Sequence, residues 1–186
     1  SSLARHRKVF TIGSMQFSEF SLHQDILRGI ADMGFEECTE IQELTMAHSL
    51  KGRDVLGQSQ TGTGKTAAFI ITIFQLFLNT ILSSESEDTE SANSMEEPGG
   101  PKFSSALIIV PTRELAVQIQ KEAESIGKYL SFHVGSFFGG VGYKQQFDMI
   151  KKGMDIIIAT PGRLIDLMNS KKIVLKDTDI LVIDEA

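Results

Sequence analysis

The chain has 186 residues, 41% of them hydrophobic, which is enough for one domain with a buried core but not for two. No apolar run approaches the roughly 20 residues of a membrane span, and the first residues form no secretory signal, so a cytoplasmic protein is expected. The single cysteine, Cys38, excludes an intrachain disulfide, and the four histidines lack metal-ligand spacing, which argues against a zinc site.

The net charge of −6 comes from one acidic segment, residues 83–101, which contains six acidic and no basic residues. The rest of the chain has 18 acidic residues (24 − 6) and 18 basic ones, so its net charge is zero. A neutral domain can still bind a nucleic-acid backbone locally, because binding depends on where the charges lie. We expect the segment to be a mobile surface loop, because it is Ser/Glu-rich and has no aromatic side chain to bury. A regulatory or partner-binding tail is the alternative.

Helices and strands are expected to alternate along the chain. Two helices are predicted first, over Leu22–Met33 and Glu40–Leu50, ahead of a strand over Asp54–Gly57. Apolar residues then recur with the three-four spacing of an amphipathic helix within Ile70–Ile81 and again within Leu115–Leu130.

Between the first strand and the Ile70–Ile81 helix lies a glycine-rich turn, residues 58–66. Gly62 and Gly64 let the backbone pass close to an anion, so that successive N–H groups can point at phosphate oxygens. Lys65 adds a positive charge, and the Thr66 hydroxyl can ligate a magnesium ion, while the helix N-terminus faces the same phosphates. Ser59 stands where the usual pattern has its first glycine, and an ordinary strand-to-helix turn is the alternative.

Three later apolar runs do not alternate with polar residues: Ala106–Val110, Ile156–Ala159 and Ile180–Ile183. Strands buried on both faces have this composition, which indicates a parallel sheet covered by helices on each side. A further strand is expected over Phe132–Phe138 and a further helix over Lys144–Lys151. Together these elements predict a doubly wound α/β sheet.

Two acidic residues, Asp184 and Glu185, follow the last apolar run. They end a strand at the edge of an open α/β sheet, which is where ligands bind. A magnesium triphosphate needs a carboxylate and hydrolysis needs a base, so Asp184 would hold the metal through water and Glu185 would deprotonate the attacking water. Acidic residues also favour the first turn of a helix, so the prediction depends on the pairing with the glycine-rich turn.

Together with this turn, ordered elements along the chain resemble those of DEAD-box RNA helicases. Phe17 stands 17 residues ahead of Gly34, where that family has an isolated aromatic residue. The other matching elements are Gly34–Gln42 (the Q motif), Pro111–Leu115 (P-T-R-E-L), Gly139–Gly140 (the double glycine), Thr160–Arg163 (T-P-G-R) and Val182–Ala186 (the opening of the D-E-A-D box). The resemblance implies a RecA-like P-loop NTPase fold, incomplete at its C-terminus, with residues 15–186 as the N-terminal helicase-core domain. Residues 1–14 fall outside it, as an extension or leader.

The resemblance implies ATP and Mg²⁺ as cofactors. The amide of Gln42 can bond both N6 and N7 of adenine, and Phe17 can stack on the ring. The alternatives are that Gln42 caps a nearby helix and that Phe17 packs in the core. Cys38 replaces the proline that the family usually has. Lys65 and Glu185 are the catalytic residues that the resemblance implies, and Thr66 and Asp184 are the residues that would bind Mg²⁺. The residues implied for ATP are Phe17, Thr39, Gln42, Ser59, Gln60, Thr61, Gly62, Thr63, Gly64, Lys65, Thr66 and Asp184.

The remaining elements imply a rim that binds single-stranded RNA. Hydroxyl groups and helix N-terminal amides would reach phosphates there, while Arg113 and Arg163 would add charge. Such contacts recognise the backbone, so little sequence specificity is expected. The residues implied are Pro111, Thr112, Arg113, Gly139, Gly140, Thr160, Pro161, Gly162 and Arg163.

The family's S-A-T element and its second helicase domain, which supplies arginines to the ATP site, are absent from these 186 residues. The resemblance implies that a further strand lies between residues 54–57 and the strand ending at Asp184. We therefore expect an excerpt of a longer protein, one that aggregates or stays partly unfolded alone and hydrolyses little ATP.

The function implied is that of an ATP-dependent RNA helicase, which couples ATP hydrolysis to local unwinding of RNA duplexes or to RNP remodelling. One alternative is a non-enzymatic RNA-binding or assembly module that keeps the nucleotide pocket as a scaffold. The acidic pair and Lys65–Thr66 argue against it, because a scaffold needs none of them. A different P-loop NTPase is the other alternative, disfavoured by Gln42 and Thr160–Arg163.

Overall fold

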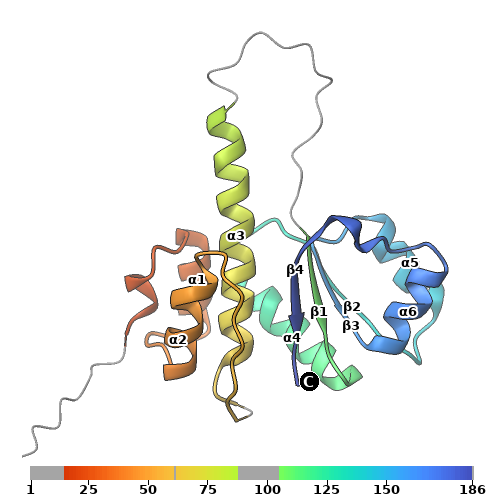
Figure 1. The fold of residues 1–186 in the computed structure, drawn as a ribbon, viewed down its shortest axis with the longest axis horizontal. Coiled ribbons are helices and arrows are strands. Elements are labelled where there is room, and N and C mark those ends of the chain that lie inside the picture. Colours follow the sequence, from red (N-terminus) through yellow and green to blue (C-terminus); the bar gives the residue numbers. More distant parts are fainter. Residues whose placement is uncertain (1–14, 61, 88–104, 186) are drawn as a thin grey trace, which may run out of the picture.

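The computed structural model describes residues 15–60, 62–87 and 105–185, and at its centre lies a parallel sheet (Figure 1). Its strands are β1 (Ser105–Ile109), β2 (Val134–Phe137), β3 (Ile156–Ala159) and β4 (Thr178–Ile183). They lie side by side in the order β2-β3-β1-β4, and each neighbouring pair is parallel. The predicted parallel sheet is therefore confirmed.

Helices cover both faces of this sheet, as predicted for the α/β class (Figure 1). Residues Leu107 and Ala159 pack on one side with the helices α5 (Tyr143–Lys151) and α6 (Pro161–Asn169). The opposite side packs against a larger group of helices: α1 (Gln24–Asp32), α2 (Glu40–Ser49), α3 (Lys65–Glu87) and α4 (Arg113–Ile126). Short 3-10 helices span Phe17–Glu19 and Leu175–Asp177.

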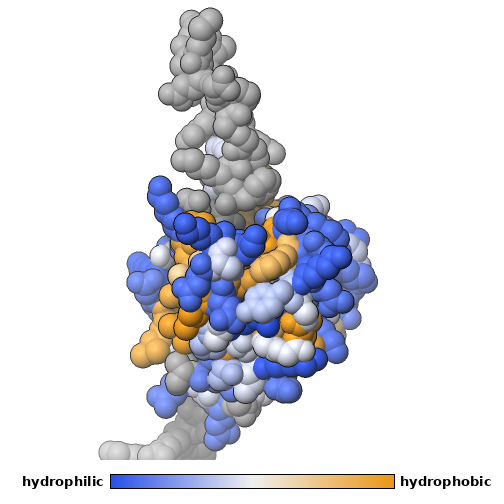
Figure 2. Space-filling view, turned by 90° about the vertical axis from the view of Figure 1, so that its right-hand side faces the viewer, coloured by the Kyte–Doolittle hydropathy of each residue, from blue (hydrophilic) through white to orange (hydrophobic). Residues whose placement is uncertain are grey.

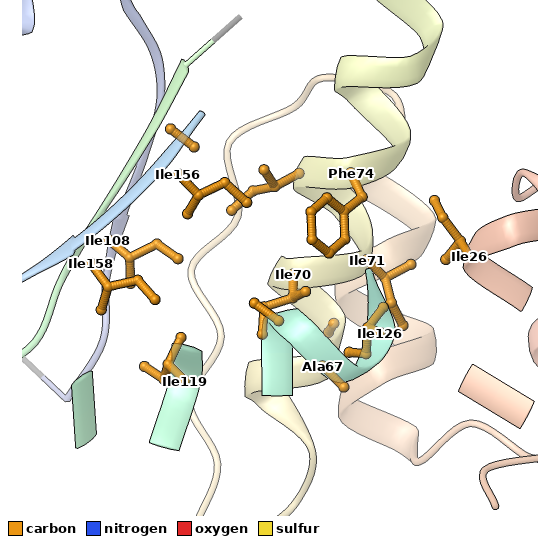
Figure 3. Close-up of a cluster of buried hydrophobic side chains, with 14 of the residues drawn as sticks. Ile26, Ala67, Ile70, Ile71, Phe74, Ile108, Ile119, Ile126, Ile156 and Ile158 are labelled. Carbon is orange, nitrogen blue, oxygen red and sulfur yellow. The ribbon is translucent and has the colours of Figure 1, made fainter. Parts of the chain in front are cut away.

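The larger core forms around α3 (Figure 3). Ile70, Ile71 and Phe74 of this helix are at most 1% exposed, and they lie between α1, α4 and the isoleucines of β1 and β3. Because α3 has neighbours on several sides, it is apolar around much of its circumference. Among the described residues, α3 is the one helix long and apolar enough to cross a membrane, contrary to the sequence interpretation, but half of that stretch is buried inside the domain.

Residues 54–57 do not form the predicted strand, so that prediction is wrong. A strand exists only where its backbone groups bond to a neighbour, and within the described sheet no strand pairs with this segment. Val55 and Leu56 are instead 41% and 100% exposed. The segment and β4 both line a groove of about 1660 Å³.

Other elements also differ from the sequence prediction. The acidic segment was expected to be loop from Ser83, yet α3 continues to Glu87, where Ser83 and Ser84 donate hydrogen bonds to the carbonyl groups of the preceding turn. Residues 88–101, like residues 1–14, lie outside the described part of the chain. Helix α6 was not predicted; Pro161 occupies its first turn, where a missing N–H costs nothing.

Candidate nucleotide and RNA site

The carboxyl ends of the four parallel strands meet at one edge of the sheet, which is where an open α/β fold binds ligands. Three backbone hydrogen bonds of 3.0 Å continue the ladder past the strand ends: Val110 N–H donates to Ala159, Thr160 to Phe137, and Asp184 to Ile109. The polypeptide segments that leave β1, β3 and β4 are thereby fixed relative to one another. The predicted RNA elements and the acidic pair Asp184 and Glu185 thus begin along this one edge.

The glycine-rich turn ends at the N-terminus of α3, whose first residue is Lys65. Gly62 and Gly64 have φ angles of 82° and 87°, which residues with a side chain rarely adopt. The Lys65 ammonium group donates a hydrogen bond of 2.8 Å to the Ser59 carbonyl, so the turn closes around its own cation. Within the turn, the Thr63 hydroxyl bonds to the Ser59 hydroxyl and donates to the Gln60 carbonyl; Thr61 lies outside the described residues.

The Q-motif residues contact the turn directly. Thr39 caps α2, and its hydroxyl donates to the Thr63 carbonyl at 2.8 Å. The Gln42 amide accepts from Thr39 N–H at 2.9 Å and donates to the Gly64 carbonyl at 3.1 Å. A Cβ atom on Gly64 would collide with this amide, so the close approach requires glycine. Both polar ends of Gln42 are therefore engaged inside the protein, and an adenine would have to replace these partners.

Phe17, assigned by resemblance to adenine stacking, is 2% exposed and packs in the larger core. Its ring face does not line the groove beside the glycine-rich turn. The adenine contact of Phe17 stays a prediction, and it requires this side chain to expose its ring.

The groove between residues 54–57 and β4 joins the two halves of the predicted ATP site. Lys65 and Asp184 both line it. Thr66, beside Lys65, is half-buried, and hydroxyl and carboxylate oxygens are the ligands that Mg²⁺ prefers. Among the described residues no three His, Cys, Asp or Glu side chains gather where they could hold a metal ion. Glu185 is exposed, with a φ angle of 55°.

The predicted RNA elements lie close together on the same edge. Thr112 caps α4 by accepting from Leu115 N–H at 3.2 Å, and the Arg113 guanidinium lies 5.0 Å from the centre of the Phe138 ring. A Cβ atom on Gly140 would lie 4.0 Å from an Arg113 nitrogen, which places the double glycine beside this arginine. The other exposed residues of this set are Pro111, Gly139, Pro161 and Gly162, and Thr160 is half-buried.

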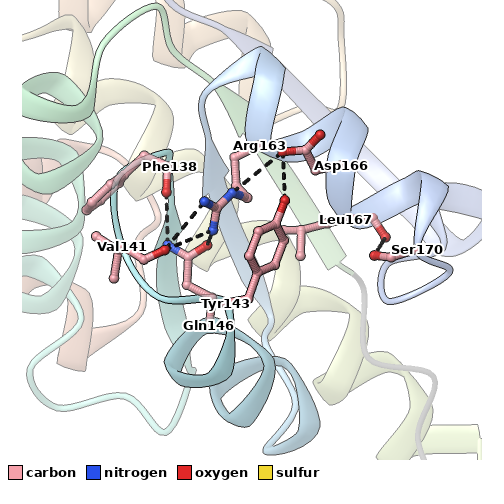
Figure 4. Close-up of polar contacts among 8 residues, drawn as sticks. All are labelled: Phe138, Val141, Tyr143, Gln146, Arg163, Asp166, Leu167 and Ser170. Carbon is pink, nitrogen blue, oxygen red and sulfur yellow. Dashed lines mark hydrogen bonds and ion pairs between the residues drawn. The ribbon is translucent and has the colours of Figure 1, made fainter.

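The sequence predicts that Arg163 adds charge to this rim, but the structure does not expose the Arg163 side chain there. Its side chain is buried, with 7% of its surface exposed. The guanidinium group donates to Gln146 Oε1 at 2.6 Å and to the Val141 carbonyl, and it lies 4.2 Å from the centre of the Tyr143 ring (Figure 4). The reason is long-range packing, because α5 lies against the first turn of α6. Gln146 was not among the residues predicted for the site. The pattern that could have indicated it is a polar residue on the buried side of the predicted Lys144–Lys151 helix.

The Cys38 thiol is expected to react slowly in the native protein. It is buried, and this burial, with smaller contributions from Glu43 and Glu19, raises its pKa to about 11 from 9.0. At pH 8 the thiolate fraction is then about 100-fold lower than in the unfolded chain. Because the folded pKa is raised, the thiol stabilises the fold below pH 9, and this contribution is lost as the pH rises through 11.

Labelling by a chromogenic disulfide reagent, followed with and without denaturing urea, measures this difference. Equal rates for native and unfolded protein would contradict it.

Comparison with known proteins agrees with this geometry. The family model described as DEAD/DEAH box helicase matches residues 39–186. The ATP-dependent RNA helicase RhlB of Hamiltonella defensa is 42% identical over 171 residues, and RhlB of Xanthomonas oryzae is 43% identical over 171 residues. These matches cover 92% and 91% of the chain, which spans only 37% and 28% of the two relatives.

Among solved structures, the fold resembles the crystal structure of a hypothetical ATP-dependent RNA helicase from Sulfolobus tokodaii. The TM-score is 0.71 at 32% sequence identity, and the match covers 87% of this chain and 41% of that one. This match confirms the predicted helicase-core fold. Since the family model spans residues 39–186 and the relatives agree with it, the chain belongs to the DEAD/DEAH box helicase family.

Proposed function

We propose that the chain is the ATP-binding part of a DEAD-box ATP-dependent RNA helicase, a cytoplasmic enzyme that couples ATP hydrolysis to local unwinding of RNA duplexes or to RNP remodelling. The observation that supports this most is the joint position of Lys65 and Asp184 on one groove, with the Thr112, Gly140 and Thr160 segments at the same sheet edge. A nucleotide and a nucleic-acid strand bound to these two sets would contact adjoining strand ends.

In the ATP site, the N–H groups of residues 62–64 and the N-terminus of α3 would bind the phosphates. Lys65 would exchange the Ser59 carbonyl for a phosphate oxygen and so carry its charge to the group transferred. When bound, Mg²⁺ would neutralise phosphate charge, held by Thr66 and, through water, by Asp184. Glu185 would orient the attacking water and accept its proton.

In the RNA site, the helix N-termini after β1 and β3 would bind successive phosphates of a single strand. Arg113 would supply an exposed cation, since it lies over Phe138 with its side chain accessible. These groups would bind the RNA backbone, so we expect little dependence on RNA sequence.

ATP turnover by the full-length protein, measured with and without single-stranded RNA, tests the proposal. We expect RNA to stimulate turnover and ATP to support strand separation. Turnover independent of RNA, abolished by Lys65→Ala, would exclude a helicase and leave an ATPase. RNA binding without any nucleotide binding would favour the scaffold alternative.

A further inference from the structure

The exposed double glycine is held at both ends by one pair of buried side chains (Figure 4). On one side, the Gln146 amide donates to the Phe138 carbonyl at 3.1 Å. On the other, the two terminal nitrogens of Arg163 donate to the Val141 carbonyl at 3.5 and 3.4 Å. The two side chains are themselves joined, because Arg163 donates to Gln146 Oε1 at 2.6 Å. Both ends of the turn from Phe138 to Val141 are thus hydrogen-bonded to two side chains that are also hydrogen-bonded to each other.

The pair also connects two elements that follow different strands. Gln146 belongs to α5, which comes after β2, and Arg163 belongs to the first turn of α6, which comes after β3. Thr160 and Gly162, at the start of α6, are therefore tied to the position of Gly139 and Gly140.

The Arg163 guanidinium group contacts other side chains of the protein on several sides. Gln146 is 2% and Arg163 7% exposed, the Tyr143 ring lies 4.2 Å from the guanidinium carbon, and Asp166 Oδ2 lies 3.9 Å from Nε. The Tyr143 hydroxyl donates to the same Asp166 oxygen at 2.9 Å. Arg163 Nε is buried without a hydrogen-bond partner. A buried cation with an unpaired N–H is a costly way to hold two helices together, since apolar side chains of similar volume are often as stable.

From these contacts we infer that Arg163 and Gln146 are a positioning pair for the RNA site and that neither touches RNA. They set the distance between the double glycine and the α6 N-terminus, and so the spacing at which the two bind successive phosphates. The inference rests on the proposed function, because it concerns the RNA rim.

Salt dependence separates positioning from direct contact. A cation that neutralises a phosphate of single-stranded RNA contributes about 0.7 to the slope of log affinity against log salt. A positioning residue contributes nothing to that slope, although its loss weakens binding. Exposed Arg113 serves as the control for a direct contact.

The test uses the full-length protein, with Arg163→Gln, Gln146→Glu and Arg113→Gln, and single-stranded RNA of one length titrated from about 50 to about 200 mM salt. We expect Arg163→Gln to lower RNA affinity about tenfold with an unchanged slope, while Arg113→Gln lowers the slope by about 0.7. Gln146→Glu can still pair with Arg163 but loses the donor to Phe138, so it should weaken RNA binding at unchanged slope and keep the fold.

Two further measurements exclude a merely structural effect. Nucleotide affinity without RNA should stay unchanged in both variants of the pair. The double variant should bind RNA about as tightly as whichever single variant binds RNA more weakly, because the two residues act as one unit. A slope lowered by about 0.7 in Arg163→Gln, or unchanged RNA affinity in Gln146→Glu, would overturn the inference. If the unaltered protein binds no RNA, the proposed function fails instead.

Discussion

Replacing Lys65 with alanine is expected to lower ATP turnover of the full-length protein by about two orders of magnitude or more. Removing one preorganised group that stabilises transition-state charge typically costs about that much, and Lys65 is the cation at the glycine-rich turn and at the N-terminus of α3. In the described part of the chain, its side chain donates a hydrogen bond to the Ser59 carbonyl, worth about 1 kcal/mol. The fold should therefore persist while catalysis is lost.

Glu185→Gln is the matched control for this change, because it removes the proposed base and keeps the phosphate cradle. We expect it to bind nucleotide normally and to turn over slowly, whereas Lys65→Ala should lose nucleotide affinity as well. Equilibrium binding of a fluorescent ATP analogue and steady-state phosphate release measure the two quantities. An unaltered turnover rate in Lys65→Ala would remove this lysine from the proposed mechanism.

Local sequence was sufficient to predict the parallel sheet and the glycine-rich turn. The apolar run over residues 156–159 coincides with β3, because a strand bonded on both sides and covered on both faces needs apolar residues throughout. The turn was predictable because Gly62 and Gly64 adopt backbone angles that strongly favour glycine.

Contacts between distant segments account for what the sequence did not predict. The Arg163–Gln146 pair joins residues 17 positions apart on different helices, and no local pattern shows that an arginine after a proline-glycine turn will be buried. At Cys38 the backbone N–H donates to the Met15 carbonyl at 2.7 Å, a bond that the family's usual proline could not form. Residues 54–57 have strand-like composition, but no strand in the described part of the chain pairs with them.

The isolated 186-residue polypeptide is expected to self-associate through β4. Leu181 and Ile183 pair in register with Leu107 and Ile109 of β1, which pack in the core with α5 and α6. Leu181 and Ile183 themselves are 58% and 59% exposed. Apolar surface interrupts the hydrophilic one on the α5 and α6 side of the molecule (Figure 2). Beyond β4 no described strand accepts its outer backbone groups, and an open apolar strand edge is a template for pairing with another chain.

Leu181→Lys combined with Ile183→Lys should therefore raise the monomer fraction of this polypeptide, since two charges oppose stacking of one apolar edge on another. Size-exclusion chromatography with light scattering measures the fraction. The control is Ile165→Lys combined with Val174→Lys, which adds the same charge at residues 55% and 72% exposed but outside β4. Equal effects of both pairs would assign the gain to net charge and not to the strand edge. A monomeric unaltered polypeptide with a cooperative thermal transition would contradict self-association itself.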